Sequence, residues 1–509
     1  MHRLLHGTSR PCVLGFSGVG LAALLAATLT VGAHPTRLQA PAPAPAPMDA
    51  VLRRLASGEE SASLLRVIVT LRDGDRRGLD QVLGRHGHAV VAELPLINAV
   101  TVEAHASELA AIAALPGVRS LSSDGTVRSA SDRVEFNRTR GYRDVEGKRH
   151  HYVVPEEDGA PTQGLTAETT TASLLPLRDV LGIDGVRTSG SGIGVAVIDS
   201  GYQKNSDIED VYAWRDFTPA ARTKPYDDFG HGTHIAGIIK GKGDLSDGRH
   251  LGVASDTRII ALKVLDAQGQ GDVTSVIAAI QLAVARHDSW GIDVINLSLG
   301  HPVYEPAATD PLVQAVEAAV RAGIAVVVSA GNHGTLIDDS TSTGYGGINS
   351  PGNAPSAITV GATDAMGTRS RVDDQIATFS SRGPTPYDNV VKPDLVAPGR
   401  RVLAPIPVAS TLGVALADRL VCFKDCAYAT AKYVPLSGTS MAAAVTSGAA
   451  AAVLREPRHG PRHVAAPHAR GAESHPAVHG GGRAGCRRAL TRRRGHQSRR
   501  RTHARACCR

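Results

Sequence analysis

From Leu174 to Leu454, short and uniformly apolar segments alternate with segments of helical periodicity. The apolar segments are only long enough for strands, and their nearly continuous apolar character indicates burial on both faces. This alternation predicts an α/β fold in which a parallel sheet has helices on both faces, with catalytic residues at the carboxyl ends of strands. The predicted strands are Gly194–Ile198, Arg258–Val264, Asp293–Leu299 and Ile324–Ser329, and the predicted helices are His231–Ile239, Val273–Arg286 and Pro311–Arg321.

The apolar content of the chain is sufficient for a large core. Of its 509 residues 42% are apolar, and this length leads us to expect two to four domains. Aromatic residues make up only 4%, whereas glycine occurs 54 times, which favours close backbone packing over a core of aromatic side chains.

The net charge of +7 is unevenly distributed along the chain. Residues 457–509 contain 14 Arg and a single acidic residue, Glu473. The rest of the chain carries 41 basic and 47 acidic side chains and is therefore mildly acidic. A nucleic-acid-binding function inferred from the high pI would depend on this segment alone, so we predict no specific nucleic-acid partner.

The N-terminus has the pattern of a secretory signal peptide over residues 1–33. Arg3 and Arg10 form a positive segment before the apolar stretch Leu14–Val31, and cleavage is expected after Ala33. A membrane anchor is the alternative, but the stretch is short and rich in glycine for a stable span. We therefore expect a secreted mature chain with no membrane contact after signal cleavage.

Three further regions are predicted before the α/β domain. Residues 34–63 form a Pro- and Ala-rich spacer, in which Pro41–Pro47 is stiff, extended and predicted to join no core. Residues 64–124 follow the order β-α-β-β-α-β, which predicts a small α+β domain of ferredoxin-like topology, with Ser107 as the N-cap of its second helix. Residues 125–173 are polar and largely aperiodic, and are predicted to be a linker exposed to cleavage.

Three short motifs of the α/β region place polar residues where catalysis could use them. Asp199 ends an apolar strand in VIDSG, His231 opens a helix in DDFGHGTHIAG, and Ser440 begins an apolar helix in SGTSMAAAV. Each residue has an ordinary interpretation when taken alone: a turn residue, a helix start and a helix N-cap. Their joint occurrence favours a catalytic triad.

The chemistry of acyl transfer requires these three residue types together. A serine hydroxyl is barely ionised at neutral pH and needs a neighbouring imidazole to take its proton. The imidazole needs a carboxylate that fixes its tautomer and stabilises its cation. A helix N-terminus at Ser440 would add a backbone N–H group where the oxyanion develops, and the small residues Gly438 and Ala442 suit that geometry.

With these motifs, residues 174–455 resemble the catalytic domain of the subtilisin-like serine proteases, the subtilases. The order Asp, His, Ser and the spacing of 32 residues between Asp199 and His231 are similar to the pattern of that family. The resemblance implies a subtilisin-like fold and a serine endopeptidase that needs no cofactor for its chemistry. It also implies that His231 is the base and that His234 is a buried helix residue.

The resemblance assigns further site residues. The segment SAGNHG is similar to the oxyanion motif of the family, which implies that the Asn332 amide stabilises the oxyanion beside the Ser440 N–H. The segment INLSLG is similar to the strand that pairs with the substrate backbone, which implies that Ser298, Leu299 and Gly300 bind substrate. Main-chain pairing of this kind suits extended polypeptides of varied sequence.

The small α+β region, residues 64–124, is similar to the inhibitory pro-domain of the family through the segment PLINAVTVEAHASELAAIAALPGVRSLSSD. An autoinhibited zymogen is then expected, with the pro-domain as an intramolecular inhibitor. A preformed domain can also assist the folding of a partner rich in long-range contacts. An unrelated small binding domain is the alternative.

Two features depart from the pattern of the family. Ala444 stands four residues after Ser440, where the family usually has proline, and this change suits a helix. Residues 456–509 have only three large aliphatic residues and cannot form the two closing amphipathic helices of the family. The abrupt change predicts a frame-shifted C-terminus. A genuine Arg-rich tail is one alternative, and a non-catalytic product that keeps the motifs is another.

The cysteines and acidic residues leave two smaller questions open. Cys12 lies in the predicted signal peptide, and Cys486, Cys507 and Cys508 lie in the C-terminal tail. The remaining pair, Cys422 and Cys426, has a spacing that is consistent with a local disulfide or with two free thiols. No metal is predicted at the site of chemistry. Asp227 and Asp228 are candidate ligands of a structural calcium ion, although two adjacent acidic residues in a loop are more often simply solvated.

Overall fold

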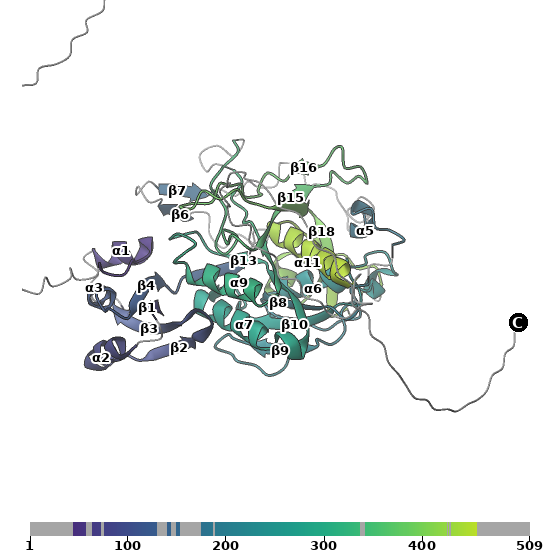
Figure 1. Cartoon of the computed structure of the whole chain (residues 1–509). Helices are drawn as coiled ribbons and strands as arrows, with labels where there is room; N and C mark the ends of the chain where they lie inside the picture. The colour runs from purple at the N-terminus through teal and green to yellow at the C-terminus, as the bar shows by residue number, and fades with distance from the viewer. Residues whose placement is uncertain are drawn as a thin grey trace, which may run out of the picture. The chain divides into compact units, whose positions relative to one another are not determined.

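The computed structural model describes residues 44–57, 64–72, 76–129, 140–143, 149–152, 175–186, 189–335, 342–424, 426 and 429–455. These residues form a small α+β domain near the N-terminus and a larger α/β domain (Figure 1). The predicted signal peptide, most of the predicted linker and the tail 456–509 lie outside the described residues.

A central sheet organises the α/β domain. Its strands are β8 (Gly194–Asp199), β9 (Ala213–Asp216), β10 (Arg258–Lys263), β12 (Ile292–Leu297), β14 (Ala325–Ser329), β15 (Ile358–Asp364), β16 (Gln375–Ile376) and β17 (Leu395–Pro398). Their order is β16-β15-β14-β12-β8-β10-β9, and β17 pairs with β15. All these pairs are parallel except β15 with β16. The predicted parallel sheet is confirmed, because the four predicted apolar strands are β8, β10, β12 and β14.

Helices cover both faces of this sheet. The longer ones are α6 (His231–Lys240), α7 (Val273–Ala285), α9 (Pro311–Arg321) and α11 (Thr439–Arg455), and the shorter ones are α5 (Leu177–Val180), α8 (His287–Trp290), α10 (Thr411–Ala415), η3 (Asp244–Ser246) and η4 (Ala417–Arg419). Val197 of β8 shares a core with α6 and α11, whereas Ile198 shares a core with α7 and α9. Successive strand residues point to opposite faces, so the two helix pairs lie on opposite sides. Within the described ranges, no helix has the length and apolar character to span a bilayer.

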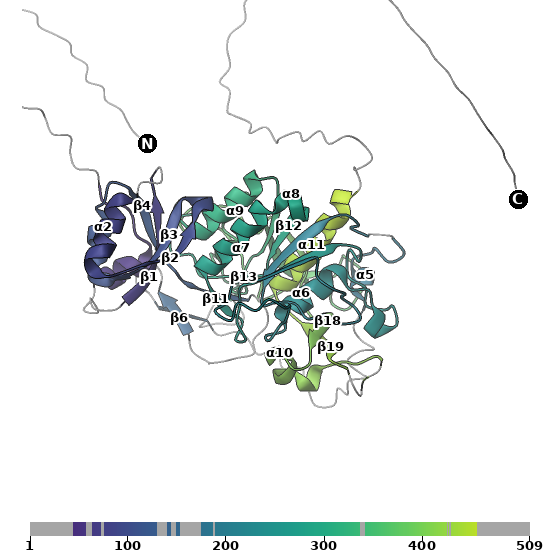
Figure 2. The same ribbon diagram turned by 90° about the horizontal axis from the view of Figure 1, so that it is seen from below.

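The small domain is an antiparallel sheet with two helices. Its elements are β1 (Leu64–Leu71), α2 (Arg77–His86), β2 (Val90–Leu94), η1 (Pro95–Ile97), β3 (Ala99–His105), α3 (Leu109–Ala113) and β4 (Val118–Ser123). The strand order is β2-β3-β1-β4. The sheet meets the larger domain at α7 (Figure 2). In this contact the hydroxyls of Thr101 and Thr274 lie 2.7 Å apart.

The predicted spacer differs from the structure at its C-terminal end. Ala46 is 6% exposed and belongs to the core of the small domain, so the prediction that Pro41–Pro47 joins no core is wrong at this residue. Leu52 of α1 (Ala50–Ala56) packs in the same core. The reason is geometric: an extended segment can lie along a strand, as the bridge between Met48 and β4 shows.

The predicted N-cap in the small domain is also wrong. Ser107 lies inside a 3-10 turn, η2 (Ala106–Glu108), which comes before α3. The cap is built from His105 and Glu108, because the Glu108 carboxylate accepts from the His105 backbone N–H at 2.7 Å. Several residues around Ser107 are compatible with a helix N-terminus, and only the backbone geometry decides which of them is the N-cap.

The predicted linker begins with a strand. β5 (Thr126–Ser129) lies between β11 (Gln270–Asp272) and β13 (Leu299–Gly300) in a separate three-stranded sheet. The sequence TVRS contains a single apolar residue, so periodicity could not reveal it. Further along, β6 (Arg140–Arg143) pairs with β7 (Arg149–Tyr152) as a hairpin.

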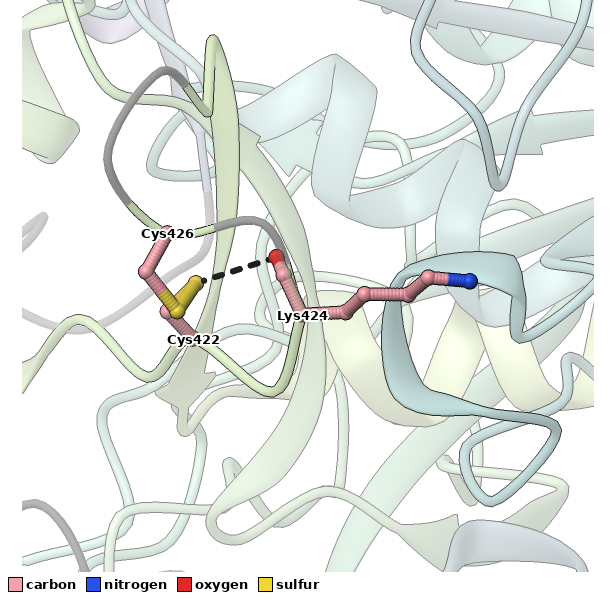
Figure 3. Close-up of a disulfide and its surroundings, with 3 residues drawn as sticks. All are labelled: Cys422, Lys424 and Cys426. Carbon is pink, nitrogen blue, oxygen red and sulfur yellow. Dashed lines mark hydrogen bonds between the residues drawn. A yellow bond between two sulfur atoms is a disulfide. The ribbon is translucent and has the colours of Figure 1, made fainter.

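A hairpin of β18 (Val402–Pro407) and β19 (Ala431–Leu436) carries the close cysteine pair in the segment that joins its strands. Cys422 and Cys426 form a disulfide, which decides between the two alternatives left by the sequence. Figure 3 shows the bridge and the 3.3 Å contact between Cys422 Sγ and the Lys424 carbonyl.

Candidate active site

Asp199 and His231 form a buried pair. Asp199 ends β8 and His231 begins α6, and the two residues are 1% and 0% exposed. His231 Nδ1 lies 2.8 Å from Asp199 Oδ1 and 2.9 Å from Oδ2. Ser200 N also donates to Asp199 Oδ1 at 2.6 Å and so orients the carboxylate. A proton on Nδ1 that is donated to this carboxylate leaves Nε2 as the basic nitrogen.

The turn before His231 requires glycine. Gly230 has a φ of +106°, in the left-handed region, and serves as the N-cap of α6. A Cβ at this position would lie 2.5 Å from Ser410 Oγ. Glycine accepts both the conformation and the close approach, and the helix can therefore begin with His231 against Asp199.

Asp227 ties this turn to the end of β8. Its two carboxylate oxygens accept from Ser200 Oγ, Gly230 N, Thr233 N and Thr233 Oγ1 at 2.6–2.9 Å. Ser200 Oγ in turn accepts from Gly232 N at 2.9 Å. The strand that ends in Asp199 and the helix that begins with His231 are thus held together by one network.

These contacts do not fit the predicted calcium site at Asp227 and Asp228. Both oxygens of Asp227 already accept hydrogen bonds, and Asp228 forms an ion pair of 2.7 Å with Lys263. Calcium needs six to eight oxygen ligands, several of them carboxylate or carbonyl oxygens that are not engaged elsewhere. In the part of the chain that the structure describes, no group of three or more His, Cys, Asp or Glu could hold a metal ion.

Ser440 lies at the second position of α11 and is fully buried. Its hydroxyl donates to the Ser298 carbonyl at 3.1 Å, and the Ser298 hydroxyl donates to the Ser440 carbonyl at 3.0 Å. Ser298 follows Leu297 of β12, which is in register with Ile198 of β8. Ser440 is therefore held at the carboxyl ends of two adjacent strands, one of which ends in Asp199.

No hydrogen bond joins Ser440 to the histidine in this structure. His231 Nε2 is buried and has no hydrogen-bond partner among the described residues. The helices that begin at these two residues, α6 and α11, share one core. A serine side chain has three staggered rotamers, and catalytic hydrogen bonds commonly form only when substrate is bound.

Asn332 follows β14 and faces the start of α11. Its carboxamide oxygen accepts from the backbone N–H and the hydroxyl of Thr439, each at 3.0 Å. Gly331 N donates to the Thr439 hydroxyl at 3.1 Å. These bonds fix the orientation of the carboxamide, with its nitrogen directed away from Thr439 N. The predicted oxyanion residue thus lies beside the residue that precedes Ser440.

The predicted substrate-binding residues line a site that the chain itself occupies. Leu299 and Gly300 of β13 pair antiparallel with Ser129 and Arg128 of β5, and β11 pairs with the other edge of β5. We call the space between β11 and β13 the strand site. The Val127 side chain of β5 is fully buried there and packs in the same core as Leu299.

His234, one turn after His231, is a structural residue. It is fully buried, and Nε2 lies 3.1 Å from the Val434 carbonyl. Burial lowers the pKa of His234 to about 3, and repulsion from His231 acts in the same direction. His234 is therefore neutral at ordinary pH, in agreement with the prediction that it is a buried helix residue.

Two parts of the site were missed in the sequence. β11 is short and polar, and nothing in Gln270–Asp272 distinguishes it from a loop. Lys263 ends β10 directly after the apolar run Ile259–Leu262 and is fully buried. A lone lysine at the end of a continuous apolar run was a usable signal for a buried cation at the carboxyl edge of the sheet.

Residues 190–473 match the Subtilase family (Peptidase_S8). The chain belongs to the subtilase family. This subtilase is 37% identical over 279 residues to serine protease AprX of Bacillus subtilis (strain 168). The aligned region covers 54% of this chain and 59% of AprX. It is 35% identical over 268 residues to the subtilisin of Bacillus pumilus, and the aligned region covers 52% of this chain and 78% of that protein.

Among solved structures, this subtilase is similar to fervidolysin from Fervidobacterium pennivorans, a keratinolytic enzyme related to subtilisin. The TM-score is 0.55 at 24% identity, over 81% of this chain and 56% of fervidolysin. A likeness at this identity shows the fold. The chain spans 59% of the length of AprX and 56% of that of subtilisin E of Bacillus subtilis (strain 168).

Proposed function

We propose that this subtilase is a secreted serine endopeptidase that hydrolyses peptide bonds through an acyl-enzyme and is made as an autoinhibited zymogen. The observation that carries the proposal is the buried pair of Asp199 and His231. Ser440 is bonded to Ser298, which follows the strand next to the one that ends in Asp199. The three side chains provide a carboxylate, a base and a hydroxyl at one edge of a parallel sheet, as acyl transfer needs.

In this proposal Ser440 is the nucleophile. Its hydroxyl turns from the Ser298 carbonyl to His231 by rotation about the Cα–Cβ bond. Ser440 Oγ then bonds to the scissile carbonyl carbon as His231 Nε2 takes the hydroxyl proton. The C–N bond breaks when His231 returns this proton to the leaving amine. Water then attacks the ester carbonyl carbon as His231 Nε2 takes a proton from it. The bond between this carbon and Ser440 Oγ breaks, His231 gives the proton to Ser440 Oγ, and the carboxylic acid product leaves.

Asn332 and the Ser440 backbone N–H are the proposed donors to the oxyanion. The first N–H groups of a helix have no acceptor within the helix, and Ser440 lies in the first turn of α11. The carboxamide of Asn332 is held by Thr439 on its oxygen side, which supports a role for its nitrogen as a fixed donor. Preoriented donors of this kind stabilise the transition state more than the substrate.

Extended polypeptides are the proposed substrates. β5 supports this substrate class, because it occupies the strand site as an antiparallel strand with a partner on each edge. Backbone pairing supplies affinity without regard to sequence, and the buried Val127 adds a preference for an aliphatic side chain at one position.

The same strand supports autoinhibition by the small domain. β5 follows β4 directly, so folding of the small domain delivers β5 to the strand site. Contacts next to β5 hold the two domains together: Asp124 accepts from Thr274 N at 2.9 Å, and Arg66 pairs with Asp272 at 3.3 Å. While β5 lies between β11 and β13, a substrate strand cannot pair there. Cleavage after Ser129, followed by release of the small domain together with β5, would open the site.

Secretion is proposed from the signal-peptide pattern of residues 1–33. The disulfide between Cys422 and Cys426 supports it, because such bonds persist in oxidising compartments.

A fluorophosphonate probe tests the proposed function. The purified chain should be labelled at Ser440, and Ser440→Ala should abolish labelling without loss of the near-ultraviolet circular dichroism of the folded chain. Labelling should accelerate when the small domain is removed by processing, and the new N-terminus should lie within a few residues after Ser129. A folded, processed chain that never reacts with the probe would rule out catalysis and favour a non-catalytic product.

A further inference from the structure

A small cavity on the boundary between the two domains is lined by three carboxylates. Asp49 comes from the small domain, and Glu305 and Asp310 come from the larger one. These residues are 1%, 7% and 2% exposed, and the cavity of about 10 Å³ has room for at most one water molecule. Among the described residues that line it there is no lysine or arginine. Three negative charges in so dry a space would repel one another strongly.

Two of the three carboxylates are held in their ionised form by hydrogen bonds. Asp49 accepts from two backbone N–H groups, at 2.7 and 2.6 Å. Asp310 is the N-cap of α9 and accepts from two backbone N–H groups through Oδ1, at 2.9 and 3.1 Å. Bonds of this kind stabilise a carboxylate over the neutral acid. A charge on Glu305 would therefore be the third in the cavity.

Glu305 is the member of this cluster that takes up a proton. Burial, and then repulsion from Asp310, raises the pKa of Glu305 from 4.5 to about 8, and the charge of Asp49 acts in the same direction. The neutral acid avoids the repulsion, so the cavity contains two charges instead of three at neutral pH.

The other titratable groups around the cavity do not supply a compensating positive charge. Burial raises the pKa of Tyr304 and of Tyr387, so both phenols are neutral at ordinary pH. His301 Nδ1 lies 2.7 Å from the carbonyl of the next residue, which holds the ring in place. The basic side chains that act on the two tyrosines are exposed and screened by water: Arg53, Arg54 and Arg128.

The small domain completes the surroundings of Glu305. Its residues Asp49, Ser122 and Ser123 line the cavity, and Ala50 N donates to the Tyr304 carbonyl at 3.1 Å. When the small domain leaves, Glu305 gains water and loses the repulsion from Asp49, so its pKa returns toward the ordinary value. The docked state therefore binds more protons at Glu305 than the separated state does.

We propose that docking of the small domain is coupled to a proton on Glu305, so that rising pH favours release of the small domain from the strand site. The sign follows from linkage: between about pH 4.5 and 8 the state with more bound protons is disfavoured as pH rises, by up to about tenfold per pH unit. The inference rests on the proposed autoinhibition for its functional meaning, but docking can be measured in an inactive chain.

Amide hydrogen exchange measures docking in the full Ser440→Ala chain. Three backbone N–H groups donate across the domain boundary: Ala50 N to the Tyr304 carbonyl at 3.1 Å, Leu96 N to Gln281 Oε1 at 3.1 Å and Thr274 N to Asp124 Oδ1 at 2.9 Å. Their protection, corrected for the intrinsic effect of pH on exchange, should fall by at least about tenfold between pH 6 and pH 8.5. Amides between β8 and β10, inside the larger domain, should keep their protection. Constant protection of the three boundary amides would overturn the proposal.

Matched variants assign the effect to Glu305. Glu305→Gln keeps the shape of the protonated side chain, so the protection of the boundary amides should lose most of its dependence on pH. Glu317→Gln is the control, because Glu317 lies on α9 outside the cavity, and it should behave like the unsubstituted Ser440→Ala chain. An equal fall with Glu305→Gln and with Glu317→Gln would refute the proposal.

Asp310→Asn provides a second test if Glu305→Gln fails to fold. Asparagine is also a good N-cap, so α9 should persist while the repulsion on Glu305 is removed. The loss of protection between pH 6 and pH 8.5 should then be smaller, and an unchanged loss would refute the role of this carboxylate pair.

These outcomes are separable from the test of the proposed function. If docking depends on pH but the wild-type chain never reacts with a fluorophosphonate, the proposed function alone is refuted. If the wild-type chain reacts but docking does not respond to pH, only the present inference is refuted.

Discussion

His231 Nδ1 lies 2.8 Å from Asp199 Oδ1, and neither side chain has any surface exposed to solvent. Without competing water, this contact and the Ser200 N–H determine the orientation of the carboxylate and the ring. The pair is therefore preorganised, whereas the Ser440 hydroxyl is still bonded to Ser298. The geometry of the pair is therefore built into the fold, whereas the proposed mechanism requires the Ser440 side chain to rotate.

Asp199→Asn should lower kcat by about 10⁴-fold with little change in KM, because an amide can stabilise the wrong imidazole tautomer. The substitution is nearly isosteric, so the folded state should persist. Steady-state kinetics of the processed chain measure the effect, and circular dichroism checks the fold. A kcat within tenfold of the wild type would contradict the role of the pair.

Asn332→Ala should lower kcat by about 10²–10³-fold and leave KM nearly unchanged, since the lost donor acts on charge that develops only in the transition state. The rate of fluorophosphonate labelling should fall as well, because that reaction also places charge on an oxygen at this position. A change confined to KM would indicate that Asn332 binds substrate in the ground state.

Val127→Asp should weaken autoinhibition. Val127 is fully buried in the strand site, and an unpaired carboxylate is costly there. The substitution should therefore raise the equilibrium constant for release of β5 by roughly tenfold or more. The unprocessed chain should then hydrolyse a chromogenic peptide with a higher initial rate. Thr126→Asn is the control, because this neighbouring side chain is exposed and the change adds no charge opposite Asp272. Equal rates for both variants would argue against inhibition by β5.

A small cavity between the two domains holds several buried acidic groups. Glu305 and Asp310 of the larger domain and Asp49 of the small domain line it, together with His301 and Tyr304. Burial, and then repulsion from Asp310, raises the pKa of Glu305 from its ordinary value near 4.5 to about 8. The carboxyl of Glu305 is therefore protonated in the folded chain at neutral pH.

This raised pKa predicts a pH dependence of stability. Between about pH 4.5 and 8 the folded state binds more protons at Glu305 than the unfolded state does, so the free energy of unfolding falls as pH rises through this window. Glu305→Gln should remove at least about 1 kcal/mol of that fall. Urea denaturation of the full Ser440→Ala chain at pH 5 and pH 8 measures it. An identical fall in both proteins would refute the assignment.

Reduction of the disulfide should have a modest effect. Cys422 and Cys426 are separated by four positions. In the chain-entropy description, closure of so short a loop stabilises the folded state by about 2 kcal/mol relative to the unfolded state. Cys422→Ser combined with Cys426→Ser should lower the free energy of unfolding by this amount in the Ser440→Ala chain. The bridge lies outside the catalytic pair, so kcat of the active double variant should be unchanged. A large loss of kcat would indicate coupling to the active site.

The sequence by itself determined the parallel sheet, the start of α6 at His231 and the motifs around Asp199, His231 and Ser440. These features are local: a continuous apolar run predicts a buried strand, and a glycine before a histidine predicts a turn into a helix. The four strands expected from apolar runs are the central strands of the sheet.

Only the tertiary structure decided what lies in the strand site and what surrounds the pair. β5 and β11 are short and largely polar, and they become strands because each pairs with a segment more than 140 residues away in the chain. The contacts of Ser440 with Ser298 and of Lys263 with Asp228 likewise join residues from separate elements. Such pairings leave no periodic trace in either segment, because their free energy comes from the partner and not from local propensity.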